Sequence, residues 1–246
     1  MHLTILTGAS RGLGRAVAEQ LLARGHHVLA LSRKAADIEV PPGSRLTAWA
    51  VDLADAAPVA QRLHTWLAAQ DATQLASVTL INNAGVVSQL APLSHLDADD
   101  LINALRVGLE APTLLTSVFL RVTASWPIPR KVVLVSSGLG RRAMASSATY
   151  CAAKAGLDHL ARAVALEEAS KAHGARIVSL APGIIDTDMQ VQLRSADAAL
   201  FPERANFATL KSEGRLDSAA SAATKLLTYL DRADFGSNPV GDVRDV

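Results

Sequence analysis

Six short apolar runs, separated by stretches of helical periodicity, limit the fold of this chain more than any other feature. The runs cover residues 2–7, 27–32, 46–51, 78–82, 131–136 and 176–181, mostly without polar alternation. Strands of this kind are buried on both faces, and they therefore need helices on both sides of their sheet. Helical patterns stand between the runs, at 13–21, 58–69, 98–123 and 149–173. The order predicts an α/β fold with a doubly wound parallel sheet.

The chain length favours one domain over two. Its 246 residues fit a single Rossmann-type domain over residues 1–246, and the sequence contains neither an internal repeat nor a convincing linker. The segment of about 187–214 interrupts the alternation, has mixed polarity and contains Pro202. We expect this segment to cover a substrate as a lid.

Net charge and cysteine content limit the binding partners and the cellular compartment that are expected for this chain. The net charge is +1, and no basic run stands out, so neither nucleic acid nor a membrane surface is expected as a partner. A single cysteine, Cys151, excludes an intramolecular disulfide framework and fits a reducing compartment. The chain begins with an apolar run in place of a signal-like segment, and no apolar stretch reaches the ~20 residues of a membrane span. A cytoplasmic protein without a metal site is predicted.

A glycine-rich turn, TGASRGLG at residues 7–14, joins the first apolar run to the first helical pattern. Glycines there permit a sharp bend and let a pyrophosphate approach the helix N-terminus, where free N–H groups favour anions. Such a turn alone could also be a tight connection without a ligand. The preceding strand and the following helix favour dinucleotide binding.

Three residues near the middle of the chain suit carbonyl–alcohol redox chemistry. Tyr150 and Lys154 are four residues apart, so on a helix they share one face. A tyrosine titrates near pH ~10, and a nearby ammonium favours the phenolate and lowers that pKa. Tyr150 would then exchange a proton with a carbonyl or hydroxyl oxygen, with Ser137 close by.

These motifs together resemble the short-chain dehydrogenase/reductase family. The similarity covers the turn at 7–14, the sequence NNAG at 82–85, the trio of Ser137, Tyr150 and Lys154, and Pro182-Gly183 after the sixth run. The resemblance implies that Ser137 orients the carbonyl oxygen, Tyr150 exchanges the proton, and Lys154 holds the nicotinamide ribose. It further implies cofactor contacts from Gly8, Ser10, Arg11, Gly12, Leu13, Gly14, Ser32, Arg33, Asp52, Leu53, Asn83, Ala84, Gly85, Tyr150, Lys154, Pro182, Gly183, Ile185 and Thr187.

The end of the second run bears on the choice of cofactor. Members that use NAD place an acid there for the ribose hydroxyls, whereas a 2′-phosphate needs cations. This chain has Ser32-Arg33-Lys34 at that point, and Arg11 lies in the glycine turn. NADP(H) is therefore expected, although Arg33 could also be a solvated loop residue.

One position departs from the family pattern. An asparagine in the helix before the fifth run is usual, and Gly108 stands at the expected place. Without that amide, a backbone carbonyl or an extra water must complete the proton relay from Lys154. Asn103 is a poor substitute by helical phase. A helical glycine costs about 1 kcal/mol relative to alanine, so its presence requires a local reason.

Segments near the C-terminus are similar to the branch that contains sepiapterin reductase and benzil reductase. That resemblance implies NADPH-dependent reduction of a ketone or α-dicarbonyl, with Ser137 and Tyr150 contacting the substrate. Asp242 lies near the place of a carboxylate that anchors an aminopterin ring in the pterin reducers, and an exposed tail acid is the alternative.

Two other functions stay open. A 3-oxoacyl-thioester reductase of fatty-acid synthesis would use Arg141-Arg142 as a docking patch for the carrier, and a non-catalytic dinucleotide-sensing regulator would have lost turnover. Family members commonly form homodimers or homotetramers through the two long helices, here 98–123 and 149–173.

Overall fold

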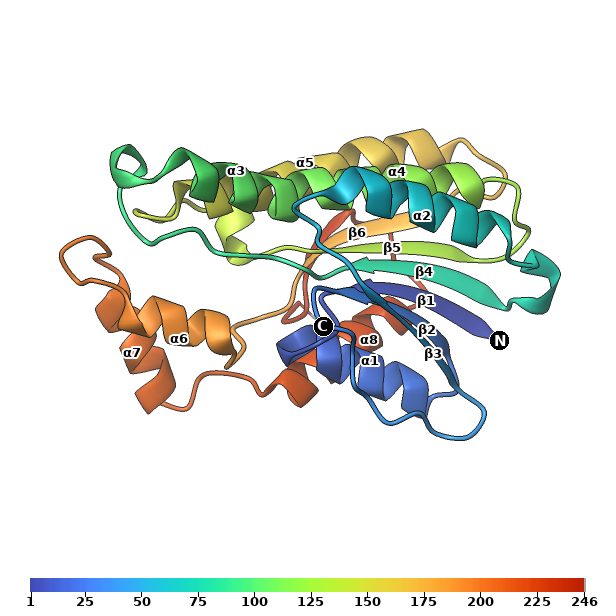
Figure 1. Ribbon diagram of the computed structural model, residues 1–246, viewed down its shortest axis with the longest axis horizontal. Coiled ribbons are helices and arrows are strands. Elements are labelled where there is room, and N and C mark those ends of the chain that lie inside the picture. Colours follow the sequence, from blue (N-terminus) through green and yellow to red (C-terminus); the bar gives the residue numbers. More distant parts are fainter. Residues whose placement is uncertain (246) are drawn as a thin grey trace.

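A computed structural model describes residues 1–245 and consists of a parallel sheet between two layers of helices (Figure 1). The strands are β1 (His2–Thr7), β2 (His27–Ser32), β3 (Arg45–Ala50), β4 (Ser77–Asn82), β5 (Arg130–Val135), β6 (Arg176–Ala181) and β7 (Val240–Asp242). The α-helices are α1 (Gly12–Ala23), α2 (Ala56–Ala68), α3 (Ala98–Leu105), α4 (Ala111–Val122), α5 (Ala148–Ala169), α6 (Asp188–Ser195), α7 (Arg204–Ser212) and α8 (Ala219–Asp231).

The strand order is β3-β2-β1-β4-β5-β6-β7, and every pairing is parallel. The chain starts at β1 in the interior of the sheet, winds outward to β3, returns to β4 and then winds the other way. This reversal opens a crevice beyond the carboxyl ends of β1 and β4, where ligands of such sheets bind. The predicted Rossmann-type doubly wound sheet is confirmed.

Helices cover both faces of the sheet, as the fully apolar strands require. α2, α4 and α5 lie over one face, and α1 and α8 lie over the other (Figure 1). Each face has its own apolar core, one centred on side chains such as Leu80 and Phe119, the other on side chains such as Val28 and Leu226. Strand β2 is buried along its whole length, which explains its lack of polar alternation.

The six predicted strands are confirmed, three of them shifted by one residue at one or both ends. The predicted continuous helix over 98–123 is wrong, because a π-helical turn (Arg106–Glu110) separates α3 from α4. Pro112 lacks the N–H that a continuous α-helix would donate to the Gly108 carbonyl, so the local hydrogen bonding must change there. Strand β7, which pairs with β6, was not predicted.

The segment predicted as a lid forms α6 and α7, which project beyond the sheet on the side of its carboxyl ends (Figure 1). Phe201 and Leu193 from this segment pack with Leu90 and Met144 in a third apolar cluster. Within residues 1–245, no helix combines the length and the apolar character needed to cross a membrane.

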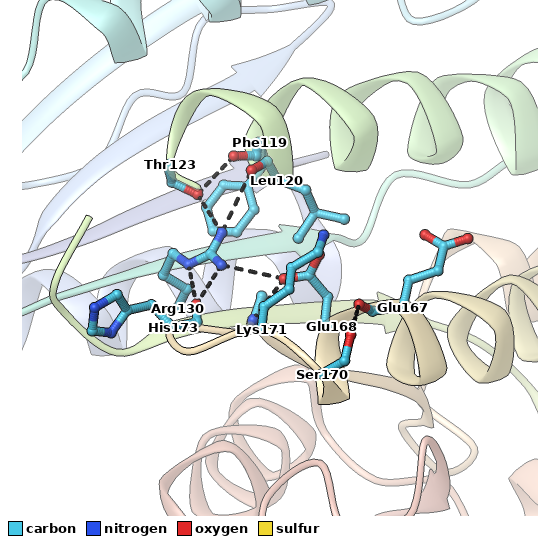
Figure 2. A network of polar contacts seen from close by, with 10 residues as sticks. Phe119, Leu120, Thr123, Arg130, Glu167, Glu168, Ser170, Lys171 and His173 are labelled. Carbon is cyan, nitrogen blue, oxygen red and sulfur yellow. Dashed lines mark hydrogen bonds and ion pairs between the residues drawn. The ribbon is translucent and has the colours of Figure 1, made fainter. Parts of the chain in front are cut away.

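A buried ion pair between Arg130 and Glu168 stabilises the C-terminal end of α5 (Figure 2). Glu168 accepts hydrogen bonds from Arg130 at 3.2 Å, from Lys171 at 2.5 Å and from the Ala175 backbone N–H at 2.9 Å. Arg130 also donates to the His173 carbonyl. Side chains of the Arg130–Glu168 pair are 1% and 2% exposed, so their charges depend on each other and on these donors.

Candidate active site

A cavity of about 1130 Å³ lies at the carboxyl ends of the strands. Its lining includes every residue predicted from the sequence to contact cofactor or substrate, with the exception of Asp242. The segment of about 187–214 contributes residues of α6, α7 and the position before α7 to the same cavity: Met189, Gln190, Leu193, Glu203, Asn206, Phe207 and Leu210. The volume suits a dinucleotide with a small substrate beside it.

The glycine turn has the shape that a phosphate cradle needs. Gly8 and Gly12 have φ of +72° and +53°, a region that side chains rarely adopt. A Cβ on Gly14 would lie 2.1 Å from the Gly8 carbonyl oxygen, so the turn closes tightly onto α1. The Arg11 side chain at the start of α1 makes no capping hydrogen bond, and the first helical turn contains no acid. The backbone N–H groups in the first turn of α1 are therefore available to a pyrophosphate.

Thr7 and Asn83 fix that turn, a role for Thr7 that the sequence did not suggest. The Thr7 hydroxyl oxygen accepts hydrogen bonds from the backbone N–H groups of Asn83 and Ala84, each at 2.9 Å. The Asn83 side chain donates back to the Thr7 carbonyl at 3.0 Å. These bonds join the carboxyl ends of β1 and β4 across the crevice.

Ser137, Tyr150 and Lys154 meet at the wall of the cavity. Ser137 follows the end of β5, and its hydroxyl oxygen accepts a hydrogen bond from the Leu139 N–H at 3.1 Å. Tyr150 and Lys154 come from successive turns of α5, with the Lys154 ammonium 5.5 Å from the Tyr150 ring centroid. The Lys154 side chain is buried and donates to the Val135 carbonyl at 2.7 Å.

The pKa of Tyr150 shifts in the direction opposite to the prediction. Burial raises the pKa of the phenol, and its interaction with the Ser137 hydroxyl offsets only part of that rise. Burial also lowers the pKa of Lys154 to about 8, against the attraction of Asp158. The reason is that both groups lose water, which disfavours the phenolate and the ammonium alike. Tyr150 thus keeps its proton at neutral pH, in the form that donates to a carbonyl oxygen.

Close packing against α5 explains why a glycine occupies position 108. Gly108 lies in the π-helical turn, and a Cβ added there would lie 3.1 Å from the Cβ of Ala153, next to Lys154. The missing side chain lets the turn pack directly on α5. Lys154 bonds to a backbone carbonyl in this structure, and Asn103 lines the cavity together with Val107, one turn further along.

The end of β2 presents cations to the cavity. Ser32, Arg33 and Lys34 line it, and no residue among 1–245 forms an ion pair with Arg33. Arg11 pairs with Asp188 at 2.5 Å, joining the glycine turn to the start of α6, and both side chains are more than two-thirds exposed. Within residues 1–245, Lys34 also forms no ion pair, so Arg33 and Lys34 are the cations at this end that can meet a ligand.

Asp242 lies outside the cavity lining. Its carboxylate accepts bonds from Arg244 at 2.8 and 2.6 Å, and this hydrogen bonding, against the effect of burial, lowers the pKa of Asp242. The residue is 6% exposed, so the alternative of an exposed tail acid is wrong. An anchoring role would require the ion pair with Arg244 to open, and Arg244 itself lines the cavity.

Arg141 and Arg142, predicted together as a docking patch, have different surroundings. Arg141 bonds Asp158 at 3.2 Å and the Gly241 carbonyl at 2.8 Å, so its guanidinium is committed within the fold. Arg142 lines the cavity and is exposed. The docking patch expected for a carrier-bound thioester is thus reduced to one arginine.

Comparisons with known proteins agree with this arrangement. A family model described as short chain dehydrogenase matches residues 2–198. The chain is 32% identical to benzil reductase ((S)-benzoin forming) of Bacillus cereus over 99% of its length and 98% of the relative's. It is 34% identical to sepiapterin reductase of Meriones unguiculatus over 98% and 95% of the two lengths. A crystal structure of a putative NAD(P) dependent gluconate 5-dehydrogenase from Beutenbergia cavernae, with bound NADP at low occupancy, matches with a TM-score of 0.80 and 25% identity, covering 98% and 94% of the chains.

Proposed function

This chain belongs to the short-chain dehydrogenase family of oxidoreductases, and on that basis we propose that it is an NADPH-dependent carbonyl reductase acting on an α-dicarbonyl compound. The observation that carries the proposal is the meeting of Ser137, Tyr150 and Lys154 in the cavity that also holds the glycine turn.

Each residue has a separate task in the proposed reaction. A bound NADPH would supply the hydride to the carbonyl carbon. Ser137 holds the carbonyl oxygen by a hydrogen bond, and Tyr150, protonated at neutral pH, gives that oxygen its proton. Lys154 contributes a positive charge beside the phenol, which stabilises the phenolate left after the transfer. The lid excludes water from the reacting groups.

Cations at the end of β2 support NADPH over NADH. A 2′-phosphate requires charged donors, and Arg33 and Lys34 line the cavity where an acid would otherwise bind ribose hydroxyls.

Reversing the charge of Arg33 tests this preference. Arg33→Glu is expected to raise KM for NADPH by about 10- to 100-fold, from the loss of a charge-assisted hydrogen bond, while KM for NADH changes little. Initial rates with both cofactors measure it. Arg15→Gln, on the exposed face of α1 where Arg15 pairs with Glu19, is the control and should behave as wild type. An equal rise for both cofactors would show that Arg33 does not contact the 2′-phosphate.

Apolar side chains at the lid end favour a diketone with aromatic or aliphatic groups. Leu139, Met144, Leu193, Phe207 and Leu210 line the cavity there. Asp242, the carboxylate suited to an aminopterin ring, is held by Arg244. Benzil therefore fits the proposed site better than a pterin does.

A substrate panel tests the activity. NADPH oxidation is measured with benzil, sepiapterin and an acetoacetyl thioester at equal concentrations. The proposal predicts the highest kcat/KM for benzil. Preference for the thioester would support the fatty-acid reductase, and NADPH binding without turnover of any of the three would support the sensing regulator.

The pH dependence of kcat/KM is expected to follow the protonation of Lys154. Its pKa of about 8 lies below its ordinary value of 10.5, so the side chain is cationic below pH 8 and neutral above it. Because the cation stabilises the Tyr150 phenolate, kcat/KM for carbonyl reduction should be level below about pH 8 and fall about tenfold per pH unit above it. Lys154→Arg, whose charge persists to high pH, should lack this fall. A wild-type profile that stays level to pH 10 would contradict the assignment.

A further inference from the structure

Asp158 is a buried acid that the proposed reaction does not yet use. It lies on α5 one turn after Lys154, it is 2% exposed, and it does not line the cavity. Residues four apart on a helix share one face, so Asp158 and Lys154 point from the same side of α5 toward the sheet. A carboxylate in such a place requires partners for its charge.

Three donors satisfy the carboxylate, and they come from different elements. One oxygen accepts from the Ser136 hydroxyl at 2.7 Å and from the Ser179 hydroxyl at 2.6 Å. The other oxygen accepts from Arg141 at 3.2 Å. Ser136 follows the last residue of β5 and directly precedes Ser137, and Arg141 follows the short helical turn (Gly138–Gly140) that Ser137 caps. Asp158 therefore holds the backbone on both sides of Ser137.

The same contacts extend to the C-terminal strand. Arg141 donates to the Gly241 carbonyl at 2.8 Å, which ties β7 to the segment that carries Ser137. Gly140 makes this approach possible, since a Cβ there would lie 2.9 Å from the Lys154 carbonyl oxygen and 3.0 Å from the Asp158 carboxylate. The segment after Ser137 thus rests directly on α5, between Lys154 and Asp158.

Among residues 1–245, the titratable groups near Lys154 come from α5, from the loop after β5 and from β7. On α5 itself the titratable neighbours are Tyr150, Cys151 and Asp158, and from the loop after β5 Arg141 faces Asp158. The acid of β7, Asp242, is engaged by Arg244. Burial lowers the pKa of Lys154 to about 8, and Asp158 is the group that opposes this shift. The negative charge of Asp158 thus favours the cationic form of Lys154 near neutral pH.

We propose that Asp158 is a positioning residue of the reaction: it holds the segment that carries Ser137 and keeps Lys154 cationic from the next turn of α5. The inference rests on the proposed reductase function. It assigns to one buried carboxylate both the placement of Ser137 and the charge of Lys154.

Asp158→Asn tests the effect of the negative charge while the size and shape of the side chain stay the same. Asparagine keeps an oxygen for the Ser136 and Ser179 hydroxyls but removes the negative charge. The midpoint of the fall in kcat/KM above neutral pH is expected to move down by about one pH unit, while the rate at pH 6 stays within about threefold of wild type. A merely structural role would instead lower the rate equally at every pH and leave the midpoint unchanged.

Glu168→Gln is the matched control. Glu168 is also a buried acid of α5 paired with an arginine, but it lies 14 residues beyond Lys154, roughly 21 Å along the helix. Measured below its melting temperature, this variant should keep the wild-type midpoint. An equal shift in both variants would overturn the inference, because it would reflect general loosening of α5.

Arg141→Met supplies a second test with the opposite sign. Removing the cation that faces Asp158 leaves the carboxylate to act on Lys154 alone, so the midpoint should move to higher pH. If Asp158→Asn does not fold, Arg141→Met alone tests the proposal, and a midpoint equal to that of wild type would contradict it.

Wild-type enzyme that oxidises no NADPH with any substrate would refute the proposed function instead. The pH dependence of NADPH binding, followed by fluorescence, would then still report the charge of Lys154 in each variant.

Discussion

Replacing Tyr150 by phenylalanine is expected to lower kcat/KM for carbonyl reduction by about 10²- to 10⁴-fold. The variant removes only the phenolic hydroxyl, which carries the proton for the carbonyl oxygen, and the raised pKa of Tyr150 means that this proton is present at neutral pH. NADPH affinity should change little, because the glycine turn, Arg33 and Lys154 remain. Steady-state rates with benzil, together with a fluorescence titration of NADPH, measure the two effects separately.

Tyr229 provides the control for this variant. It is the second of the two tyrosines in the chain, it is part of α8, and its ring packs edge-on against Phe235 away from the cavity. Tyr229→Phe should therefore retain wild-type kcat/KM. Comparable losses in the two variants, or a Tyr150→Phe enzyme within a few fold of wild type, would remove Tyr150 from its role as proton donor.

The largest expected effect on stability belongs to Glu168. Glu168→Gln leaves the Arg130 guanidinium, 1% exposed, without its counter-charge, and this should lower the free energy of unfolding by about 3–5 kcal/mol. Urea denaturation at pH 7 measures the change. Activity per folded molecule should stay at the wild-type level, since Glu168 lies near the C-terminal end of α5 and Tyr150 lies near its N-terminal end.

The same substitution should alter acid stability. Burial opposes ionisation of Glu168, but its bonds to Lys171 and Ala175 and the charge of Arg130 lower the pKa of its carboxyl below the ordinary value of 4.5. Its ionised form therefore stabilises the fold above about pH 4.5, and that contribution is lost as the pH falls through the lowered pKa. Glu168→Gln should lack this part of the acid transition. Equal stability of variant and wild type at pH 7 would contradict the role given to the ion pair.

Much of the fold was predictable because apolar periodicity reports directly on burial. β1, β2 and β6 begin and end at the predicted residues. The interruption between α3 and α4 was missed, although Pro112 signals it, because Pro112 lacks the N–H for the Gly108 carbonyl. β7 was missed because three residues, Val-Gly-Asp, carry no periodicity, and its place depends on pairing with β6 from a distant part of the chain.

The candidate site was predictable where local motifs define it and less so where distant contacts do. The glycine turn and the trio line one cavity because the strands that precede them end at the same edge of a parallel sheet. Asp158 gave no signal, since its partners Ser179 and Arg141 approach it only in the folded chain. The direction of the Tyr150 pKa was mispredicted because spacing alone indicates the nearby lysine but not the loss of water around the phenol.

The stoichiometry of benzil reduction tests the central claim most directly. Purified wild-type protein is mixed with benzil and a limiting amount of NADPH at pH 7, and NADPH loss and alcohol formation are followed together. One molecule of benzoin should form for each NADPH consumed, and Tyr150→Phe should form almost none over the same time. NADPH that stays unoxidised, or benzoin formed equally well by the Tyr150→Phe protein, would contradict a carbonyl reductase centred on Ser137, Tyr150 and Lys154.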